Sequence, residues 1–270
     1  MTKRSDPAAW KAIERLPFLH KAQADPRGTL VALDVDGTVS PIVESPQDAT
    51  VGAEVRATLD HLSRRLHLWF VSGRNAEDAR RMVDVAAAGY VGSHGLEVLD
   101  DEGLRPLQPM SEFQDTMARF AQAVAADVPE AAPHVERKRW GVAFHYRAIQ
   151  PPSDIALKLQ RSIEAHLTPD LRVQSGKMVF EVVPAVEYDK GTALLYLIDT
   201  IRPQRVLTAG DDLTDVAMFG ALAERREQSE LEGLSIAVLH GPETPAEVVR
   251  AADATVEGVD GLHHLLRALQ

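Results

Sequence analysis

The sequence predicts an α/β protein whose Rossmann-like, parallel-sheet core is interrupted by an inserted α+β domain. Two observations support this prediction. Short apolar segments alternate with amphipathic helical segments over residues 28–100 and again over 187–270, which implies parallel strands joined by right-handed crossovers. Residues 101–186 instead carry hairpin signals, which are typical of an antiparallel sheet with helices on one face.

The first 100 residues are predicted to form an arm and the first part of the core. Residues 1–27 are expected to be an N-terminal helix or arm that ends at a Pro-Arg-Gly segment. The run Leu30–Leu33 is apolar throughout, as expected of a buried strand. The other elements expected here are a helix at 53–66, a strand at 68–71, a helix at 76–87 and a short strand at 90–91.

The inserted segment has roughly 85 residues, the size of a small domain. Residues 135–147 are predicted to form one long strand, because Val142, Phe144 and Tyr146 alternate with other side chains. Helices are expected at 111–126 and 153–167, and strands at 171–173 and 178–183 with a turn at 174–177 between them.

The alternating pattern resumes after the insert and completes the core. The expected elements are a helix at 192–200, a strand at 205–207, a helix at 213–223, a strand at 235–238, and helices at 245–252 and 261–269. The charge-dense stretch 224–232 is expected to be a solvated helix extension or loop without chemistry.

Composition limits the classes of partner and of chemistry. The 270 residues include 29 Lys plus Arg and 40 Asp plus Glu, so the formal net charge is -11, which argues against nucleic acid or an anionic membrane as a partner. There is no cysteine, which excludes disulfides and thiolate chemistry. The N-terminus lacks the apolar core of a signal peptide and no window is apolar enough to span a membrane, so we expect a cytoplasmic protein.

The first predicted core strand ends in two carboxylates. Asp34 and Asp36 lie two residues apart, on one side of an extended chain, and Gly37 then allows a sharp turn. Such a pair suits a hard cation and can divide nucleophilic attack and proton transfer between its members. A calcium loop is excluded because its fifth and twelfth positions would be Thr38 and Ser45. A strand-to-turn transition with solvated acids is the remaining structural alternative.

Three more polar clusters are predicted to lie near this pair. Ser72, Gly73 and Arg74 follow the second strand, Lys190 begins the helix after the insert, and the acid-rich segment 210–215 follows a later strand. Because the strand ends of a parallel sheet face one crevice, these groups can converge although they are distant in sequence. Taken singly, the first two clusters are also common as a turn and as a helix start.

Together these residue types suit phosphoryl transfer, which needs a nucleophile, a cation and donors for the phosphate oxygens. Asp34 can attack phosphorus, and Asp36 can protonate the leaving oxygen and later take a proton from water. Ser72 and Lys190 are expected to contact phosphate oxygens.

A divalent cation is also expected at this site. Asp34, Asp211 and the backbone carbonyl of Asp36 are the expected ligands of Mg²⁺. Asp212 and Asp215 are expected to orient the waters bound to Mg²⁺ or the lysine.

These motifs resemble those of the haloacid dehalogenase superfamily of phosphatases. Asp34 and Asp36 match its first motif, Ser72 the second, Lys190 the third and the segment 210–212 the fourth. The resemblance implies a haloacid dehalogenase core with an inserted cap domain, a need for Mg²⁺, and an aspartyl-phosphate intermediate.

The inserted domain narrows the resemblance to the trehalose-6-phosphate phosphatases. In that family a Glu-x-Lys pair and a further glutamate bind the sugar hydroxyls, which implies this role for Glu136, Lys138 and Glu181. Gly73 and Arg74 are also expected to contact substrate. The implied reaction is hydrolysis of trehalose 6-phosphate to trehalose and phosphate.

Two alternatives stay open at this point. One is another sugar phosphatase with the same core and cap, acting on sucrose phosphate, mannosyl-phosphoglycerate or glucosylglycerol phosphate. The other is a non-catalytic sensor of sugar phosphates. Association with the enzyme that makes the substrate, trehalose-phosphate synthase, is equally open.

Overall fold

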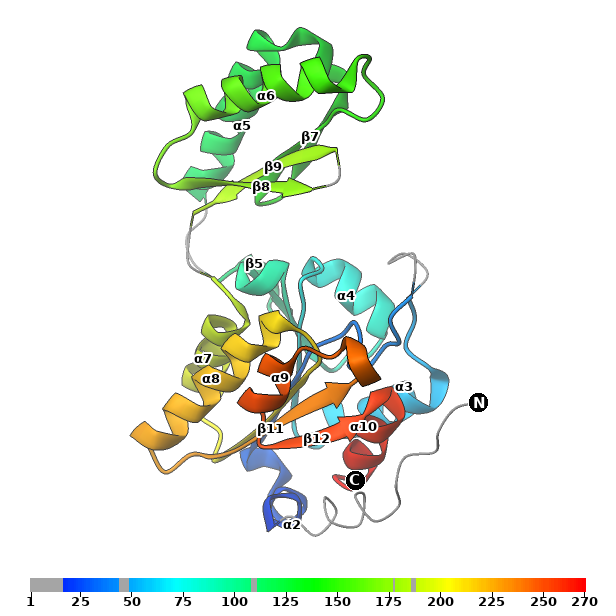
Figure 1. Cartoon of the computed structure of the whole chain (residues 1–270). Coiled ribbons are helices and arrows are strands. Elements are labelled where there is room, and N and C mark those ends of the chain that lie inside the picture. Colours follow the sequence, from blue (N-terminus) through cyan, green and yellow to red (C-terminus); the bar gives the residue numbers. More distant parts are fainter. Residues whose placement is uncertain (1–16, 44–48, 108–110, 177, 186–187) are drawn as a thin grey trace. The chain divides into compact units, whose positions relative to one another are not determined.

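The computed structural model describes residues 17–43, 49–107, 111–176, 178–185 and 188–270. The chain forms two compact units: residues 1–107 together with 188–270, and residues 108–187 (Figure 1). The first sixteen residues of the predicted arm, and Lys177 of the predicted turn, lie outside the described residues.

Unit 1 is built on an eight-stranded sheet in the order β12-β11-β10-β1-β2-β3-β4-β5. Its strands are β1 (Thr29–Leu33), β2 (His67–Val71), β3 (Gly89–Gly92), β4 (Glu97–Asp100), β5 (Gly103–Pro106), β10 (Arg205–Gly210), β11 (Glu232–Leu239) and β12 (Ala254–Glu257). The six strands from β12 to β3 pair in parallel. The central strand β1 is buried along its whole length, as the apolar run predicts.

Helices cover both faces of this sheet. One face packs against α2 (Pro17–Ala24), α3 (Ala53–Ser63), α4 (Ala76–Val83) and α10 (Gly258–Arg267). The other packs against α7 (Lys190–Ile201), α8 (Leu213–Gln228) and α9 (Ala246–Ala251). Side chains of β1 alternate between the two layers, with Val31 and Leu33 on the first face and Leu30 and Ala32 on the second. The predicted α/β core is thereby confirmed.

Two parts of unit 1 differ from the sequence-based expectation. The hairpin of β4 and β5 pairs antiparallel with β3 and extends the core sheet, so the units divide after Leu107 rather than after residue 100. The strand β12, which pairs in parallel with β11, is not predicted from the sequence. Within the described residues, the predicted N-terminal helix or arm is the helix α2, which buries Phe18 and Leu19 in the core. Short 3-10 helices complete the unit: η1 (Pro26–Gly28), η3 (Ser93–Gly95) and η5 (Gly241–Glu243).

Unit 2 is a four-stranded antiparallel sheet in the order β6-β7-β9-β8, with two helices on one face. Its elements are α5 (Ser111–Asp127), η4 (Pro129–His134), β6 (Val135–Lys138), β7 (Gly141–His145), α6 (Pro152–His166), β8 (Leu171–Gly176) and β9 (Val179–Pro184). Val124 of α5 and Leu159 of α6 pack with Phe144 and Val182 of the sheet in one apolar cluster. The predicted α+β insert is confirmed.

The single long strand predicted over residues 135–147 is wrong. The segment is a hairpin of β6 and β7, in which Lys138 pairs with Gly141 across a two-residue turn. The turn residues, Arg139 and Trp140, are not the glycine, asparagine or aspartate that usually mark a short hairpin loop. Alternation alone therefore suggested a continuous strand.

Candidate active site

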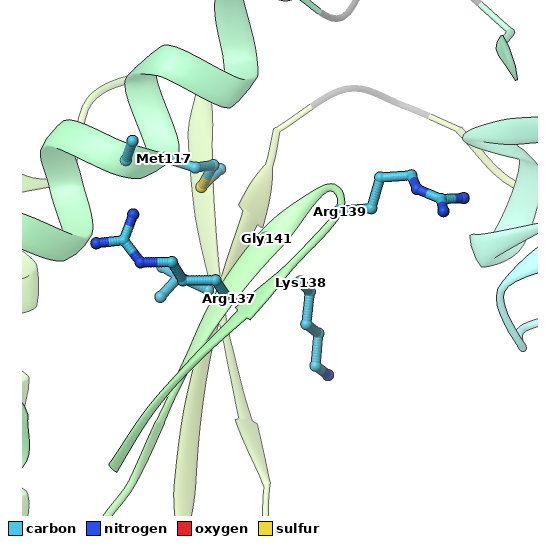
Figure 2. A pocket seen from close by; sticks show the side chains of 7 residues that line it. Met117, Arg137, Lys138, Arg139 and Gly141 are labelled. Atoms are coloured by element: carbon cyan, nitrogen blue, oxygen red, sulfur yellow. The ribbon is translucent and has the colours of Figure 1, made fainter. Parts of the chain in front are cut away.

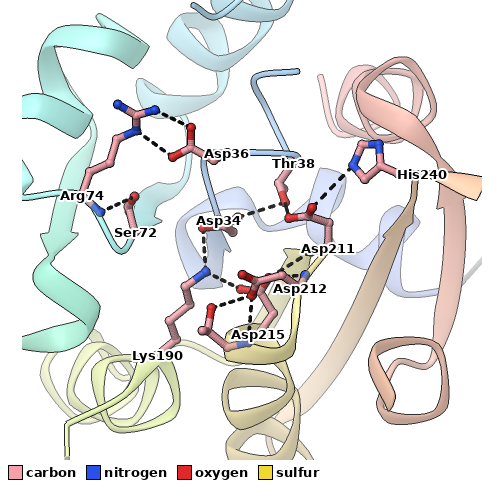
Figure 3. A network of polar contacts seen from close by, with 11 residues as sticks. Asp34, Asp36, Thr38, Ser72, Arg74, Lys190, Asp211, Asp212, Asp215 and His240 are labelled. Atoms are coloured by element: carbon pink, nitrogen blue, oxygen red, sulfur yellow. Dashed lines mark hydrogen bonds and ion pairs between the residues drawn. The ribbon is translucent and has the colours of Figure 1, made fainter. Parts of the chain in front are cut away.

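The site lies in unit 1, where the central strands β1 and β10 end. These strands are parallel neighbours, and the backbone N–H of Asp34 continues their ladder by donating to the carbonyl of Ala209 at 2.9 Å. Asp34 follows β1 directly and Asp211 follows β10, so two residues 177 positions apart meet at one sheet edge (Figure 3). This is the edge at which open α/β sheets bind their ligands.

Three buried carboxylates form a cluster that could hold a metal ion. Asp34, Asp211 and Asp215 each offer an oxygen, and these oxygens all lie within 4.8 Å of one another. The structure thus brings together the two expected ligand side chains, Asp34 and Asp211. Asp215 contributes the third carboxylate, whereas the side chain of Asp36 pairs with Arg74.

Both carboxylate oxygens of Asp215 accept hydrogen bonds from neighbouring residues. Its Oδ1 accepts from Nζ of Lys190 at 2.8 Å, and its Oδ2 accepts from the backbone N–H groups of Asp211 and Asp212 at 2.9 and 3.1 Å. With both oxygens engaged and no exposed surface, Asp215 fixes the backbone of Asp211 and the position of Lys190.

Lys190 is the buried cation of the site. It is the first residue of α7, and its Nζ lies 2.7 Å from Oδ1 of Asp34 as well as beside Asp215. Burial acts to lower the pKa of Lys190, but the charges of Asp34 and Asp215 outweigh it and hold that pKa above its usual range. The side chain is therefore an ammonium, paired with two carboxylates.

Burial and crowding raise the pKa of all three acids. Burial is the main cause for Asp34, whose pKa rises to about 6 although Lys190 opposes the rise. The pKa values of Asp211 and Asp215 each rise to about 7, chiefly through burial and then through neighbouring carboxylates. A single ammonium thus faces three crowded acids, and a further cation at their oxygens would relieve the repulsion.

The hydroxyl of Thr38 contacts the acids that follow β1 and β10. Its Oγ1 lies 3.4 Å from Oδ2 of Asp34 and 3.4 Å from Oδ1 of Asp211. Lys190 instead contacts Oδ1 of Asp34 and Oδ1 of Asp215. One oxygen of Asp34 and one of Asp211 thus lie beside the same hydroxyl, an arrangement of oxygens that suits a divalent cation.

The turn after Asp36 requires glycine. Gly37 has a φ of +77°, and a Cβ atom there would lie 2.1 Å from Oδ2 of Asp211. Both its backbone conformation and the close approach of Asp211 exclude a larger residue.

Asp36 is paired with Arg74 rather than directed at the acidic cluster. The Nε and Nη2 atoms of Arg74 donate to the two oxygens of Asp36 at 2.7 and 2.6 Å, a bidentate ion pair (Figure 3). Ser72 is 1% exposed, and its Oγ accepts from the backbone N–H of Arg74 at 3.1 Å. Gly73 has no room for a side chain, because a Cβ would lie 2.6 Å from the ring of His94.

The side chain of Asp212 contacts Thr214, whereas that of Asp215 contacts Lys190. Asp212 is the N-cap of α8, and its Oδ1 accepts from the backbone N–H and the hydroxyl of Thr214 at 2.8 and 2.6 Å. Of the two acids expected to orient the lysine or metal-bound waters, Asp215 is the one that contacts Lys190.

Sequence reasoning missed His240. The residue follows β11, and its Nε2 lies 2.7 Å from the carbonyl oxygen of Gly37 and 3.6 Å from Oδ2 of Asp211. A histidine directly after an apolar strand of the parallel sheet was the available signal, because such a position faces the crevice.

The three residues expected to bind sugar lie on one face of the sheet of unit 2. Glu136 and Glu181 occupy one row across β6, β7 and β9, on either side of Ala143, and Lys138 is two residues beyond Glu136. Nζ of Lys138 contacts Oε1 of Glu181 at 2.8 Å, and Nε2 of His145 contacts Oε2 of Glu136 at 2.8 Å. Two carboxylates, an ammonium and an imidazole therefore share this face.

The opposite face of β6 carries Arg137. Arg137 pairs in register with Val142, whose side chain is part of the apolar cluster with the helices. Figure 2 shows Arg137 directed to the Met117 side of the hairpin and Lys138 directed away from it. A cavity of about 220 Å³ lies between α5 and this hairpin. Arg137 thus belongs to the helix-covered side, and Lys138 to the face with the two glutamates.

Solved structures of other proteins share the fold of this chain. A trehalose-6-phosphate phosphatase of Aspergillus fumigatus superposes with a TM-score of 0.63 at 22% identity, covering 93% of this chain and 95% of that chain. A haloacid dehalogenase-like hydrolase of B. subtilis superposes with a TM-score of 0.53 at 16% identity, covering 89% of this chain and 99% of that chain. The fold is therefore that of the haloacid dehalogenase superfamily.

Sequence comparison identifies the family within this class. The model of the trehalose-phosphatase family matches residues 32–252. A probable trehalose-phosphate phosphatase of Sinorhizobium fredii is 33% identical over 252 residues, covering 91% of this chain and 90% of the relative. The chain belongs to the trehalose-phosphatase family.

No helix in the described part of the chain has the length and apolar character needed to cross a membrane.

Proposed function

We propose that this protein is a Mg²⁺-dependent phosphatase that hydrolyses trehalose 6-phosphate to trehalose and phosphate. The observation that carries the proposal is the cluster of Asp34, Asp211 and Asp215 around Lys190 at the sheet edge, in a chain of the trehalose-phosphatase family. Crowded carboxylates repel one another unless cations lie beside them. Phosphoryl transfer requires both a nucleophile and a divalent cation, which such a cluster can supply and bind.

The acids present fit a magnesium ion. Asp34 and Asp211 each direct an oxygen at the space beside Thr38, and all-oxygen sets are those that Mg²⁺ prefers. We assign the ion to these two side chains and to the backbone carbonyl of Asp36. When bound, Mg²⁺ supplies positive charge that stabilises the transferring phosphoryl group.

Asp34 is the proposed nucleophile. Its carboxylate attacks phosphorus, the bond to the sugar oxygen breaks, and an aspartyl-phosphate forms; water then releases phosphate and regenerates the carboxylate. Lys190 holds one oxygen of Asp34 at 2.7 Å and so fixes the carboxylate for attack. Lys190 and Ser72 are the proposed contacts to phosphate oxygens. Both are buried: Lys190 lies beside Asp34, and Ser72 directly follows β2, the strand that pairs with β1.

Asp36 is the proposed acid and base. It would give a proton to the leaving sugar oxygen and take one from the attacking water. The bidentate pair with Arg74 fixes its orientation and leaves the side chain 43% exposed, so solvent can exchange protons with it. Arg74, which contacts this carboxylate, and the preceding Gly73 are the proposed substrate contacts of unit 1.

Glu136, Lys138 and Glu181 are the proposed sugar-binding residues. Carboxylates accept hydrogen bonds from hydroxyls and an ammonium donates to them, so a face with both groups suits a polyol. Lys138 pairs with Glu181 at 2.8 Å, and we expect sugar hydroxyls to take the place of this contact.

A panel of sugar phosphates tests the proposed function. Purified protein is assayed for phosphate release from trehalose 6-phosphate, sucrose 6-phosphate, mannosyl-3-phosphoglycerate and glucosylglycerol phosphate, each with Mg²⁺ and with EDTA. We expect trehalose 6-phosphate to give the highest kcat/KM and EDTA to remove activity. A higher kcat/KM for another member would assign a different sugar, and no release from any member would contradict a catalytic role.

A further inference from the structure

We infer that His240 is a positioning residue for the proposed metal centre, and that it increases the affinity of Asp34 and Asp211 for a divalent cation. This inference rests on the proposed function, because it concerns the cation that the phosphatase reaction needs. His240 is not one of the motif residues, and it comes from a strand that contributes no other group to the acidic cluster described above.

The ring of His240 donates a hydrogen bond to the turn after β1. Its Nε2 lies 2.7 Å from the carbonyl oxygen of Gly37. A carbonyl oxygen only accepts, so Nε2 carries the proton. The same N–H group lies 3.6 Å from Oδ2 of Asp211, close enough for an electrostatic attraction (Figure 3). The side chain of His240 is 20% exposed, so the contact is largely shielded from water.

The backbone of His240 is itself fixed. Its N–H donates to Oγ1 of Thr244 at 2.6 Å, at the start of the loop that contains η5. The preceding residues belong to β11, which pairs with β10 along six positions from Arg205 to Gly210. The imidazole therefore projects from a rigid strand end, as a positioning group must.

Holding the Gly37 carbonyl fixes the residues that face the cation. Gly37 follows Asp36 and precedes Thr38, whose hydroxyl lies 3.4 Å from both Asp34 and Asp211. The N–H of Gly37 donates to the carbonyl of Ser40 at 2.8 Å, so His240 satisfies the other polar group of the same residue. With both groups held, the turn keeps one conformation against Asp211.

Loss of the imidazole should therefore weaken cation binding more than it weakens the fold. Partners that orient metal ligands typically contribute 10-fold to 100-fold in metal affinity. The scaffold around the turn remains, because Ser40, Lys190 and Asp215 keep their own contacts.

Three substitutions at one position test the inference. In His240→Gln the amide nitrogen reaches the position of Nε2 and can donate to Gly37, whereas in His240→Asn it is one methylene too short. His240→Ala removes the donor altogether. We expect the Mg²⁺ concentration for half-maximal rise in Tm to increase about 10-fold in the Ala and Asn variants, and less than about 3-fold in the Gln variant.

The control is His20→Ala, which removes an exposed histidine of α2 and should leave the Mg²⁺ response unchanged. Isothermal titration with Mg²⁺ gives the same affinities independently of turnover. An Ala variant with a lower Tm but an unchanged Mg²⁺ affinity would overturn the inference, since the role would then be purely structural. If the Ala variant does not fold, equal Mg²⁺ affinity of the Gln and Asn variants would overturn it.

Measurements on the wild-type protein distinguish failure of this inference from failure of the proposed function. If Mg²⁺ neither raises its Tm nor supports phosphate release, the proposed function fails and the inference fails with it. If wild type responds to Mg²⁺ and His240→Ala responds identically, only the inference fails.

Discussion

At the scale of the residue, one acid connects most of the groups at the site. Asp215 accepts from Lys190 and from two backbone N–H groups, and through them it holds Asp211 in place. Leaving either backbone N–H unpaired would cost about 1–3 kcal/mol, and leaving the buried Lys190 ammonium unpaired would cost more. Asp215 thus stabilises the arrangement in which Asp34 and Asp211 share the space beside Thr38.

The close approach of Gly37 to Asp211 leads to a prediction about Mg²⁺ binding and activity. In Gly37→Ala the new Cβ would lie 2.1 Å from Oδ2 of Asp211, at a φ of +77°. We expect the variant to lose its Mg²⁺-dependent rise in Tm and most of its phosphatase activity, because Asp211 must move away. Differential scanning fluorimetry with and without Mg²⁺ measures the first effect, and phosphate release measures the second.

The matched control for this variant is Gly258→Ala. Gly258 also has a positive φ, +58°, but a Cβ there meets nothing within 4 Å. Its cost should be limited to backbone strain of about 1 kcal/mol, with a normal Mg²⁺ response. If both variants respond to Mg²⁺ like wild type, the close approach of Gly37 to Asp211 is unimportant for the cation.

The candidate residues could be predicted from sequence, but their pairing could not. Asp34, Asp36 and Asp211 stand at the ends of recognisable strands, so their convergence follows from a parallel sheet. The ion pair of Asp36 with Arg74 depends on how two loops turn after their strands, which no periodicity describes. His240 belongs to no motif: its place after an apolar strand indicates that it faces the crevice, but its contact with Gly37 is seen only in the structure.

At the scale of the element, prediction succeeded where strands are long, apolar and parallel. β1 and β10 are buried along their whole length and were found. The hairpin of β4 and β5 is not predicted, because both strands are short and lie on either side of the acidic turn that suggests a domain boundary, although most of β4 is buried. The β6–β7 turn was missed because Arg139 and Trp140 carry no turn signal.

The sheet face of unit 2 that carries Glu181 leads to a prediction about sugar recognition. Glu181→Ala should raise the KM for trehalose 6-phosphate at least about 10-fold and leave the KM for a small aryl phosphate nearly unchanged. The physical reason is that removing a charged hydrogen-bonding partner of sugar hydroxyls costs about 1.5–3 kcal/mol for the sugar substrate alone. Steady-state kinetics with both substrates measure the difference.

Arg172→Ala is the control for this variant. Arg172 is exposed and lies opposite Val183 on β9, on the same face of the sheet as Glu181. Its substitution should leave both KM values unchanged. Equal effects of Glu181→Ala on the two substrates would argue against sugar recognition by this face.

At the scale of the whole molecule, the charge of the site couples stability to pH. The folded pKa values of Asp34, Asp211 and Asp215 lie at about 6, 7 and 7, above the ordinary value of 3.8. Between pH 3.8 and about pH 7, these three acids therefore bind more protons in the folded protein than in the unfolded chain. The stability that these groups contribute is fully present below pH 3.8 and is lost as pH rises through about 6 to 7.

A divalent cation should reverse this loss, because it binds the deprotonated acids. We expect saturating Mg²⁺ to raise the Tm of the protein by about 5 °C at about pH 8 and by much less at about pH 5. The measurement is the difference in Tm with Mg²⁺ and with EDTA at each pH, at constant ionic strength. The same rise at both pH values would show that the stabilising ion binds elsewhere.

Trapping the intermediate tests whether Asp34 carries the phosphoryl group during turnover. Protein in excess over trehalose 6-phosphate is mixed with Mg²⁺, quenched in acid within the first turnover and reduced with borohydride, which converts an aspartyl-phosphate to homoserine. Mass spectrometry of the digested protein should find homoserine at position 34, and Asp34→Asn should give none. Turnover of trehalose 6-phosphate by Asp34→Asn at the wild-type rate, or homoserine at another acid, would show that Asp34 is not the nucleophile.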